Sequence, residues 1–199
     1  MSAKVWTRTN PVLLDGVIEE INTQMASQLK WMTNIFGKVE RLVKTINGRD
    51  YYSANIHTKE NDYLLIAPDS GLGNFSYFVA DEPEIIDYNR YDQTHFKTPV
   101  SLVFWVDMRT IPAGAERNIE AVKQEITRFL NGGMFLRSGR FFVDRIYNKA
   151  ESIFQGFSLD EIDNQFLMQP YCGWRFEGEI EFLDTCYKNT PNNDNNGNG

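Results

Sequence analysis

The sequence contains few of the residues from which metal centres and disulfide frameworks are built. Its 199 residues include only two cysteines, Cys172 and Cys186, and two histidines, His57 and His95. Zinc sites normally draw on pairs of Cys or His at short spacing, and no such pair occurs here. Two cysteines also do not make a disulfide framework in a chain of this length. We therefore expect no metal site, and the sequence implies no cofactor.

Long apolar runs and clusters of positive charge are missing too. No segment approaches the roughly 18 apolar residues that a membrane helix needs, and Met1–Asn10 lacks the apolar run of a signal peptide. We expect a protein that is made in a reducing cytoplasm and does not bind membranes. The net charge is -7, and Lys and Arg are scattered singly. Because such a surface repels phosphate backbones, the charge argues against direct binding of nucleic acid.

Catalytic and nucleotide-binding motifs are equally scarce. The sequence has no Gly-x-Ser-x-Gly nucleophile elbow. Gly71-Leu72-Gly73 precedes an apolar segment, whereas a dinucleotide fingerprint follows a strand and opens a helix. A protein that is not an enzyme is the favoured interpretation. The alternative is a small-molecule enzyme or binding domain with a pocket near Asp107, a lone carboxylate at the end of an apolar segment.

Apolar stripes at helical spacing predict two amphipathic helices. Asn10-Pro11 combines a capping side chain with proline at the first helical position, so the first helix is expected over Pro11–Met32. The second is expected over Ala115–Asn131, where Gly132-Gly133 ends it. The Ser158–Glu161 segment matches a capping box and predicts a further short helix.

Short apolar segments between turn signals predict a largely antiparallel sheet. Asn47-Gly48 is typical of a two-residue hairpin turn, so Val39–Ile46 and Tyr51–Ile56 are expected to pair. The apolar run Val100–Val106 predicts a central strand covered on both faces. Further strands are expected over Tyr63–Ala67, Phe75–Ala80 and Arg140–Tyr147. The fold class is therefore α+β, a mostly antiparallel sheet packed against two helices. We expect a single domain over 1–188, with excursions near 84–97 and 134–169 and a disordered tail over 189–199.

The segment from Cys172 to Phe182 alternates with a period of two, which predicts a strand with one buried and one wet face. The face expected to be buried carries Cys172, Trp174, Phe176, Gly178, Ile180 and Phe182. The wet face is expected to carry Gly173, Arg175, Glu177, Glu179 and Glu181. Successive glutamates would lie about 7 Å apart. A solvated face is favoured for them, followed by contact with a cationic partner, and then by the paired carboxylates of a glycosidase.

Three aromatic residues, Tyr88, Tyr91 and Phe96, lie in the polar segment Glu84–Lys97, which has no clear period and is predicted to be a long loop. Aromatic side chains are enriched at protein interfaces, but a loop that folds back would bury them instead. Both interpretations stay open. The candidate subunit interface consists of Tyr88, Tyr91, Phe96, Glu177, Glu179 and Glu181.

The order of the predicted elements resembles that of the tail terminator and tail-completion proteins of tailed bacteriophages, and more loosely that of neck ring proteins. The matching segments are Pro11–Met32, Val100–Val106, Ile119–Leu130 and Trp174–Phe182. The resemblance implies a structural virion protein that forms a homo-oligomeric ring around the channel and contacts other neck or tail proteins. An acidic ring also lets DNA pass without sticking. The chain is longer than the small terminators, with additions over Glu84–Lys97 and Met134–Gln169.

Overall fold

The computed structural model describes residues 3–57, 62–69, 71–88, 94–112, 118–160 and 162–184. Its largest element is a seven-stranded sheet in the order β1-β2-β6-β8-β10-β9, with β7 paired to β8 off this path. The strands are β1 (Lys4–Val5), β2 (Asn34–Lys38), β6 (Phe75–Ala80), β7 (Ile85–Tyr88), β8 (Thr94–Asp107), β9 (Gly139–Tyr147) and β10 (Tyr171–Leu183). Only the β1–β2 and β2–β6 pairings among them are parallel. The expected α+β class with a mostly antiparallel sheet is confirmed.

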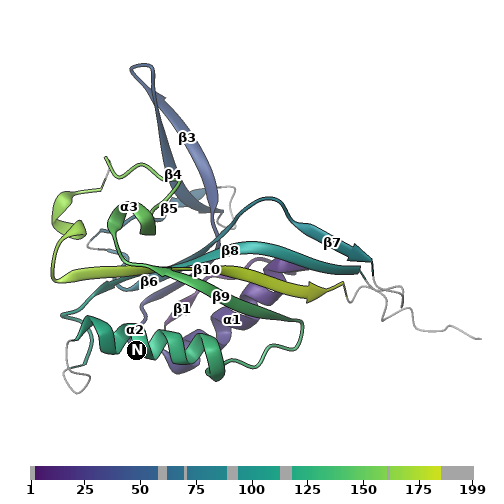
Figure 1. Ribbon diagram of the computed structural model, residues 1–199. Coiled ribbons are helices and arrows are strands. Elements are labelled where there is room, and N and C mark those ends of the chain that lie inside the picture. Colours follow the sequence, from purple (N-terminus) through teal and green to yellow (C-terminus); the bar gives the residue numbers. More distant parts are fainter. Residues whose placement is uncertain are drawn as a thin grey trace, which may run out of the picture.

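Two different layers cover the faces of this sheet (Figure 1). One face carries the helices α1 (Leu14–Gln28) and α2 (Ile119–Arg128). A π-helical turn, η1 (Phe129–Gly133), extends α2 at its C-terminal end. The other carries a small antiparallel sheet of β3 (Glu40–Ile46), β4 (Arg49–His57) and β5 (Tyr63–Leu65), together with α3 (Ala150–Ile153) and the 3-10 turn η2 (Asn164–Leu167). None of the described helices is long and apolar enough to cross a membrane.

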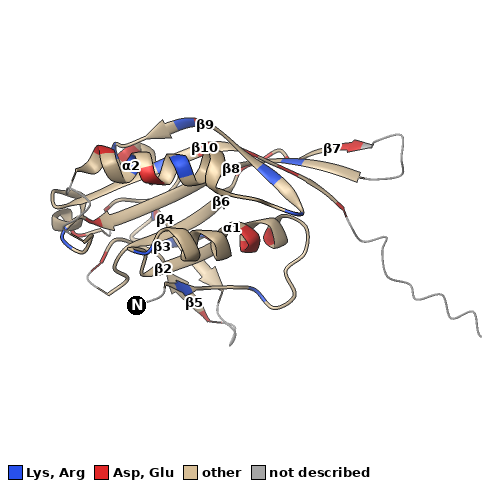
Figure 2. Cartoon of the chain, turned by 90° about the horizontal axis from the view of Figure 1, so that it is seen from below, with Lys and Arg blue, Asp and Glu red and all other residues tan. Residues whose placement is uncertain are grey.

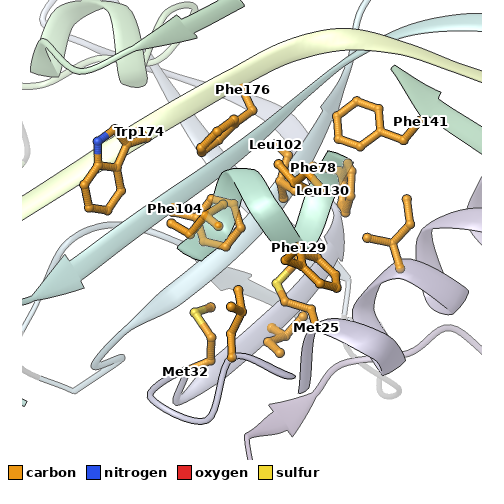
Figure 3. Packing of buried hydrophobic residues seen from close by; sticks show 14 of the residues in the cluster. Met25, Met32, Phe78, Leu102, Phe104, Phe129, Leu130, Phe141, Trp174 and Phe176 are labelled. Carbon is orange, nitrogen blue, oxygen red and sulfur yellow. The ribbon is translucent and has the colours of Figure 1, made fainter. Parts of the chain in front are cut away.

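The central strand β8 is buried on both faces, as its apolar run predicts. Leu102 and Phe104 belong to the core between the sheet and the helices, whereas Val103 and Trp105 belong to the core beneath the small sheet. Figure 3 shows side chains of the first core, in which Phe104 and Phe176 from the sheet point toward Met25 of α1 and Phe129 of η1. The alternating face of β10 is confirmed in the same core, because Trp174, Phe176 and Ile180 are at most 1% exposed.

The first helix is shorter than its apolar stripe. It begins at Leu14 rather than at Pro11, because Asn10 and Leu13 both have positive φ and no side chain caps the first turn. It ends at Gln28, yet Leu29 and Met32 remain buried in the same core. The apolar stripe therefore continues beyond the helix, to within two residues of β2. The sequence analysis did not predict this strand.

The predicted capping box at Ser158 does not open a helix. Ser158 is held against β4 instead, since its N–H donates to the Tyr52 carbonyl and its Oγ accepts from the Tyr52 N–H. Glu161 lies outside the described residues. The nearby short helical turn is η2, whose cap is Asp163, because its Oδ1 accepts a hydrogen bond from the Gln165 N–H.

Two β-hairpins extend from the layered body (Figure 1). The β3–β4 hairpin turns at Asn47-Gly48, where φ values of 52° and 76° are those that the predicted two-residue turn requires. The second is formed by β7 and the start of β8, so apart from Glu84 the described part of Glu84–Lys97 consists of strands and not of the predicted loop. Residues 89–93, and the predicted tail over 189–199, lie outside the described residues.

Candidate subunit interface

The structure gathers four of the six candidate interface residues at one end of the large sheet. Phe96 lies on β8, and Glu177, Glu179 and Glu181 lie on the neighbouring strand β10. Tyr88 ends β7, where its backbone pairs with Thr94 of β8. Its side chain and all of Tyr91 lie outside the described residues.

Phe96 faces the helical side of the sheet and is partly buried. Its ring stacks on that of Phe182, with 5.1 Å between centroids and 9° between planes, and it packs at the margin of the larger core. For this residue the structure favours the interpretation in which the segment packs back on the fold. Phe96 therefore shapes the sheet end and offers a partner only part of its ring.

The glutamate row lies on the opposite face of the sheet, where cations of the same chain balance it. Lys97 lies opposite Glu181 in the register and donates a hydrogen bond to its carboxylate. The same ammonium lies 4.0 Å from Glu179 Oε1. At the other end of the row, Glu177 Oε1 accepts a hydrogen bond of 3.0 Å from Arg175 Nε. The row is thus half-buried and internally paired, and not the freely solvated face that was favoured.

The hydrogen bond from Lys97 lowers the pKa of the Glu181 carboxyl and raises the pKa of the lysine ammonium. A general acid of a glycosidase needs the opposite, a carboxyl with a raised pKa. The lowered pKa of Glu181 therefore argues against this residue as the general acid of a glycosidase.

We expect Lys97→Gln to raise the pKa of Glu181 toward that of an ordinary glutamate, because the variant loses the charged donor. The rise should be partial, since His95 and Arg140 also lower this pKa. A pH titration of the Glu181 carboxyl carbon by NMR measures the rise in pKa. Lys149→Gln, at an exposed residue just before α3, is the matched control.

In the wild type the Lys97–Glu181 pair adds stability above the pKa of an unfolded glutamate, and this stability is lost as the pH falls through the lower pKa of the folded state. An unchanged pKa in Lys97→Gln would contradict the pairing.

The prediction that Arg175 lies on a solvent-exposed face of β10 is wrong, because its side chain is buried and the residue is only 3% exposed. Its guanidinium donates a 3.2 Å hydrogen bond to the Gln155 carbonyl and lies 3.6 Å from Asp81 in addition to its contact with Glu177. Gly173 on the same face is buried as well. The alternation predicted which way these residues point, but α3 and the segment after it cover this part of the strand.

The sequence analysis missed the exposed aliphatic side chains of the two hairpins. On β7, Ile85 and Ile86 are 50% and 48% exposed, and on β3, Val43 and Ile46 are 59% and 36% exposed. The available signal was the Ile85-Ile86 pair inside a polar segment. Exposed apolar groups of this kind on projecting strands are typical of surfaces that pair with another chain.

The surroundings of Asp107 do not resemble a catalytic pocket. Its carboxylate forms an ion pair of 2.7 Å with Arg109, whose guanidinium also donates to the Tyr171 hydroxyl at 2.8 Å. Burial, and secondarily the charge of Asp107, raises the pKa of the Cys172 thiol to about 12, so this cysteine is not a reactive thiolate. A surface hollow of about 500 Å³ lies elsewhere, beside Trp6 and α1.

Residue types that could ligate a metal are dispersed over the described part of the chain. No group of three or more His, Cys, Asp or Glu residues is placed there to hold a metal ion. His57 is exposed at the end of β4 and contacts the Tyr63 ring, whereas His95 lies on β8, 4.0 Å from Glu181. Cys186 lies outside the described residues.

Comparison with protein-family models gives no match, and comparison with curated proteins gives no significant match. The function must therefore be inferred from the geometry of this chain.

Proposed function

We propose that this protein is a structural subunit of a phage or phage-derived particle, a copy in a homo-oligomeric ring of the tail-terminator or neck type. One observation carries the proposal: two β-hairpins extend from the layered body (Figure 1), and their strands expose branched aliphatic side chains. Contact with another chain would bury Ile85 and Ile86 on one hairpin and Val43 and Ile46 on the other. This supports a role in assembly over a role in catalysis.

Ring assembly also suits the unlike charges of the two hairpins. A closed ring requires that one surface of each subunit meets a different surface of the next. The hairpin over residues 85–97 contains two carboxylates and two Lys or Arg residues, with Asp87 beside its exposed isoleucines, whereas residues 40–50 contain three Lys or Arg residues and two carboxylates. The net charge of -7 is compatible with a channel that does not retain DNA.

A small-molecule binding domain is the second candidate, and one hollow favours it. The hollow beside α1 is lined by Trp6, Lys38 and Asn22, among others. Asn22 is 1% exposed, and its amide donates to the Phe36 carbonyl while its Oδ1 has no partner among the described residues. A ligand with a hydrogen-bond donor would satisfy that oxygen. Because the atom is occluded, this candidate ranks below assembly.

The proposal is tested by mixing the protein with the products of the neighbouring genes in its source genome and imaging the mixtures by electron microscopy. Closed rings of uniform diameter are expected, alone or on a portal or tail surface that templates them. Absence of rings in every mixture, together with turnover of a small substrate, would replace the structural role with the enzymatic one.

The variant with Ile85→Ser and Ile86→Ser is expected to weaken ring formation while leaving the melting temperature nearly unchanged, because both side chains are half-exposed in the subunit. The same result is expected for Tyr88→Ser combined with Tyr91→Ser. Met168→Ser is the matched control, since Met168 is 65% exposed and belongs to neither hairpin. Ring counts by microscopy and melting by circular dichroism measure the two effects. Rings unaffected by the β7 variant would remove that hairpin from the interface.

A further inference from the structure

An apolar groove opens on the surface between the start of α1, the segment after η1 and the end of β10. It encloses about 550 Å³. Four apolar residues that line it are exposed, with exposed fractions of 64% for Val12, 43% for Leu13, 78% for Phe135 and 41% for Leu183. Exposed apolar side chains gathered around one groove are typical of an interaction site.

The backbone is strained at this groove. Leu13 has a φ of 50°, which side chains other than glycine rarely adopt, and it precedes a helix that no side chain caps. From the same helix, Glu20 Oε2 accepts hydrogen bonds from two backbone N–H groups of the opposite wall, that of Arg137 at 2.9 Å and that of Ser138 at 3.4 Å. These contacts fix the segment that presents Phe135. Strained residues of this kind cluster at active sites, ligand clamps and switch regions.

The rim of the groove is acidic. Glu19, Glu20 and Asp184 line it, with Arg137 as the single cation among the lining residues described. Figure 2 shows red acidic positions on α1 and no blue ones, in agreement with a helix that contains Asp15 and two glutamates but no Lys or Arg. A partner for this groove should therefore combine apolar side chains with positive charge.

The β3–β4 hairpin has this combination. Val43 and Ile46 point to opposite faces of β3, so the two-stranded ribbon exposes an aliphatic group on each side. Lys44 is exposed beside them and shares a face with Ile46. The β7–β8 hairpin exposes Ile85 and Ile86, but the charged residue beside them on β7 is the exposed Asp87, which the acidic rim would repel. Charge complementarity thus selects the first hairpin.

We propose that the β3–β4 hairpin of one copy inserts its tip into this groove of the next copy, with Val43 against Phe135 on one side and with Ile46 and Lys44 toward Leu13 and Glu19 on the other. The inference rests on the proposed ring. Hairpin and groove are different surfaces of one subunit, so repetition of the contact gives the head-to-tail arrangement that closes a ring.

A charge exchange tests the contact. Lys44→Glu should weaken association by about tenfold or more, because it places like charges together at the rim. Glu19→Lys should weaken it similarly, and the variant with both changes should recover most of the wild-type association. Arg128→Glu, an equal change of charge on the exposed side of α2, should leave association unchanged. Sedimentation velocity, with the templating partner where one is required, measures association, and circular dichroism checks the fold.

The two proposals fail in different ways. If the wild type forms rings and Lys44→Glu forms them equally well, or if the combined variant is weaker than either single variant, the hairpin does not occupy the groove although the ring stands. If the wild type forms no ring with any neighbouring protein, the ring and the docking contact are both overturned.

Discussion

Trp174→Ala is expected to lower the free energy of unfolding by about 3–5 kcal/mol, the usual cost of truncating a large side chain in a packed core. Trp174 is 1% exposed and lies in the larger core, opposite Phe104 in the register of β10 and β8. Removing the indole leaves a cavity between strands whose backbones are fixed by the sheet, so little collapse can compensate. Denaturant unfolding, followed by circular dichroism, measures the loss.

The matched control is Glu179→Gln on the opposite face of the same strand. Glu179 is partly exposed, and its carboxylate lies 4.0 Å from Lys97, so the change should stay within about 0.5 kcal/mol of the wild type. Equal losses from the two variants would show that the facing of β10 is wrong.

Gly178→Ala should have a still larger effect, a loss of more than about 4–5 kcal/mol or failure to fold. A Cβ atom at Gly178 would lie 1.8 Å from the Phe142 carbonyl oxygen and 2.8 Å from its carbonyl carbon. Both are backbone atoms of β9, at the point where the register between β9 and β10 shifts. No side-chain rotation relieves this overlap, so the two strands would have to separate.

Gly132→Ala provides the comparison, because a Cβ atom there meets nothing within 4 Å and the residue does not have positive φ. It should be neutral or slightly stabilising, since alanine restricts the unfolded chain more than glycine does. Soluble yield and thermal unfolding distinguish the two variants. Similar behaviour of both would contradict the close approach of β9 and β10 at Gly178.

Those parts of the fold that depend on local pattern could be predicted from the sequence. The apolar run of β8, the alternation of β10 and the turn at Asn47-Gly48 each express a rule that acts within a few residues. The end of α1 could not be predicted, because Leu29 continues its stripe and is buried outside the helix. Gly178 shows the same limit: the alternation placed it on the core face, but its role is to let another strand approach.

The candidate interface was predictable in its facing and not in its contacts. The glutamate row lies on one face as expected, but its pairing with Lys97 depends on the register between β8 and β10, which joins distant parts of the chain. The burial of Arg175 depends on α3 and the segment after it, which the sequence did not place. The exposure of Ile85 follows from the length of the sheet beyond its covering layers, which no local pattern specifies.

Assembly into a ring is the central claim, and the mass of the assembled species tests it most directly. We expect native mass spectrometry of the protein, alone and mixed with each neighbouring gene product, to show one discrete oligomer with several copies of this chain. The Lys44→Glu variant should reduce that species in favour of the monomer. A chain that stays monomeric in every mixture would contradict the account.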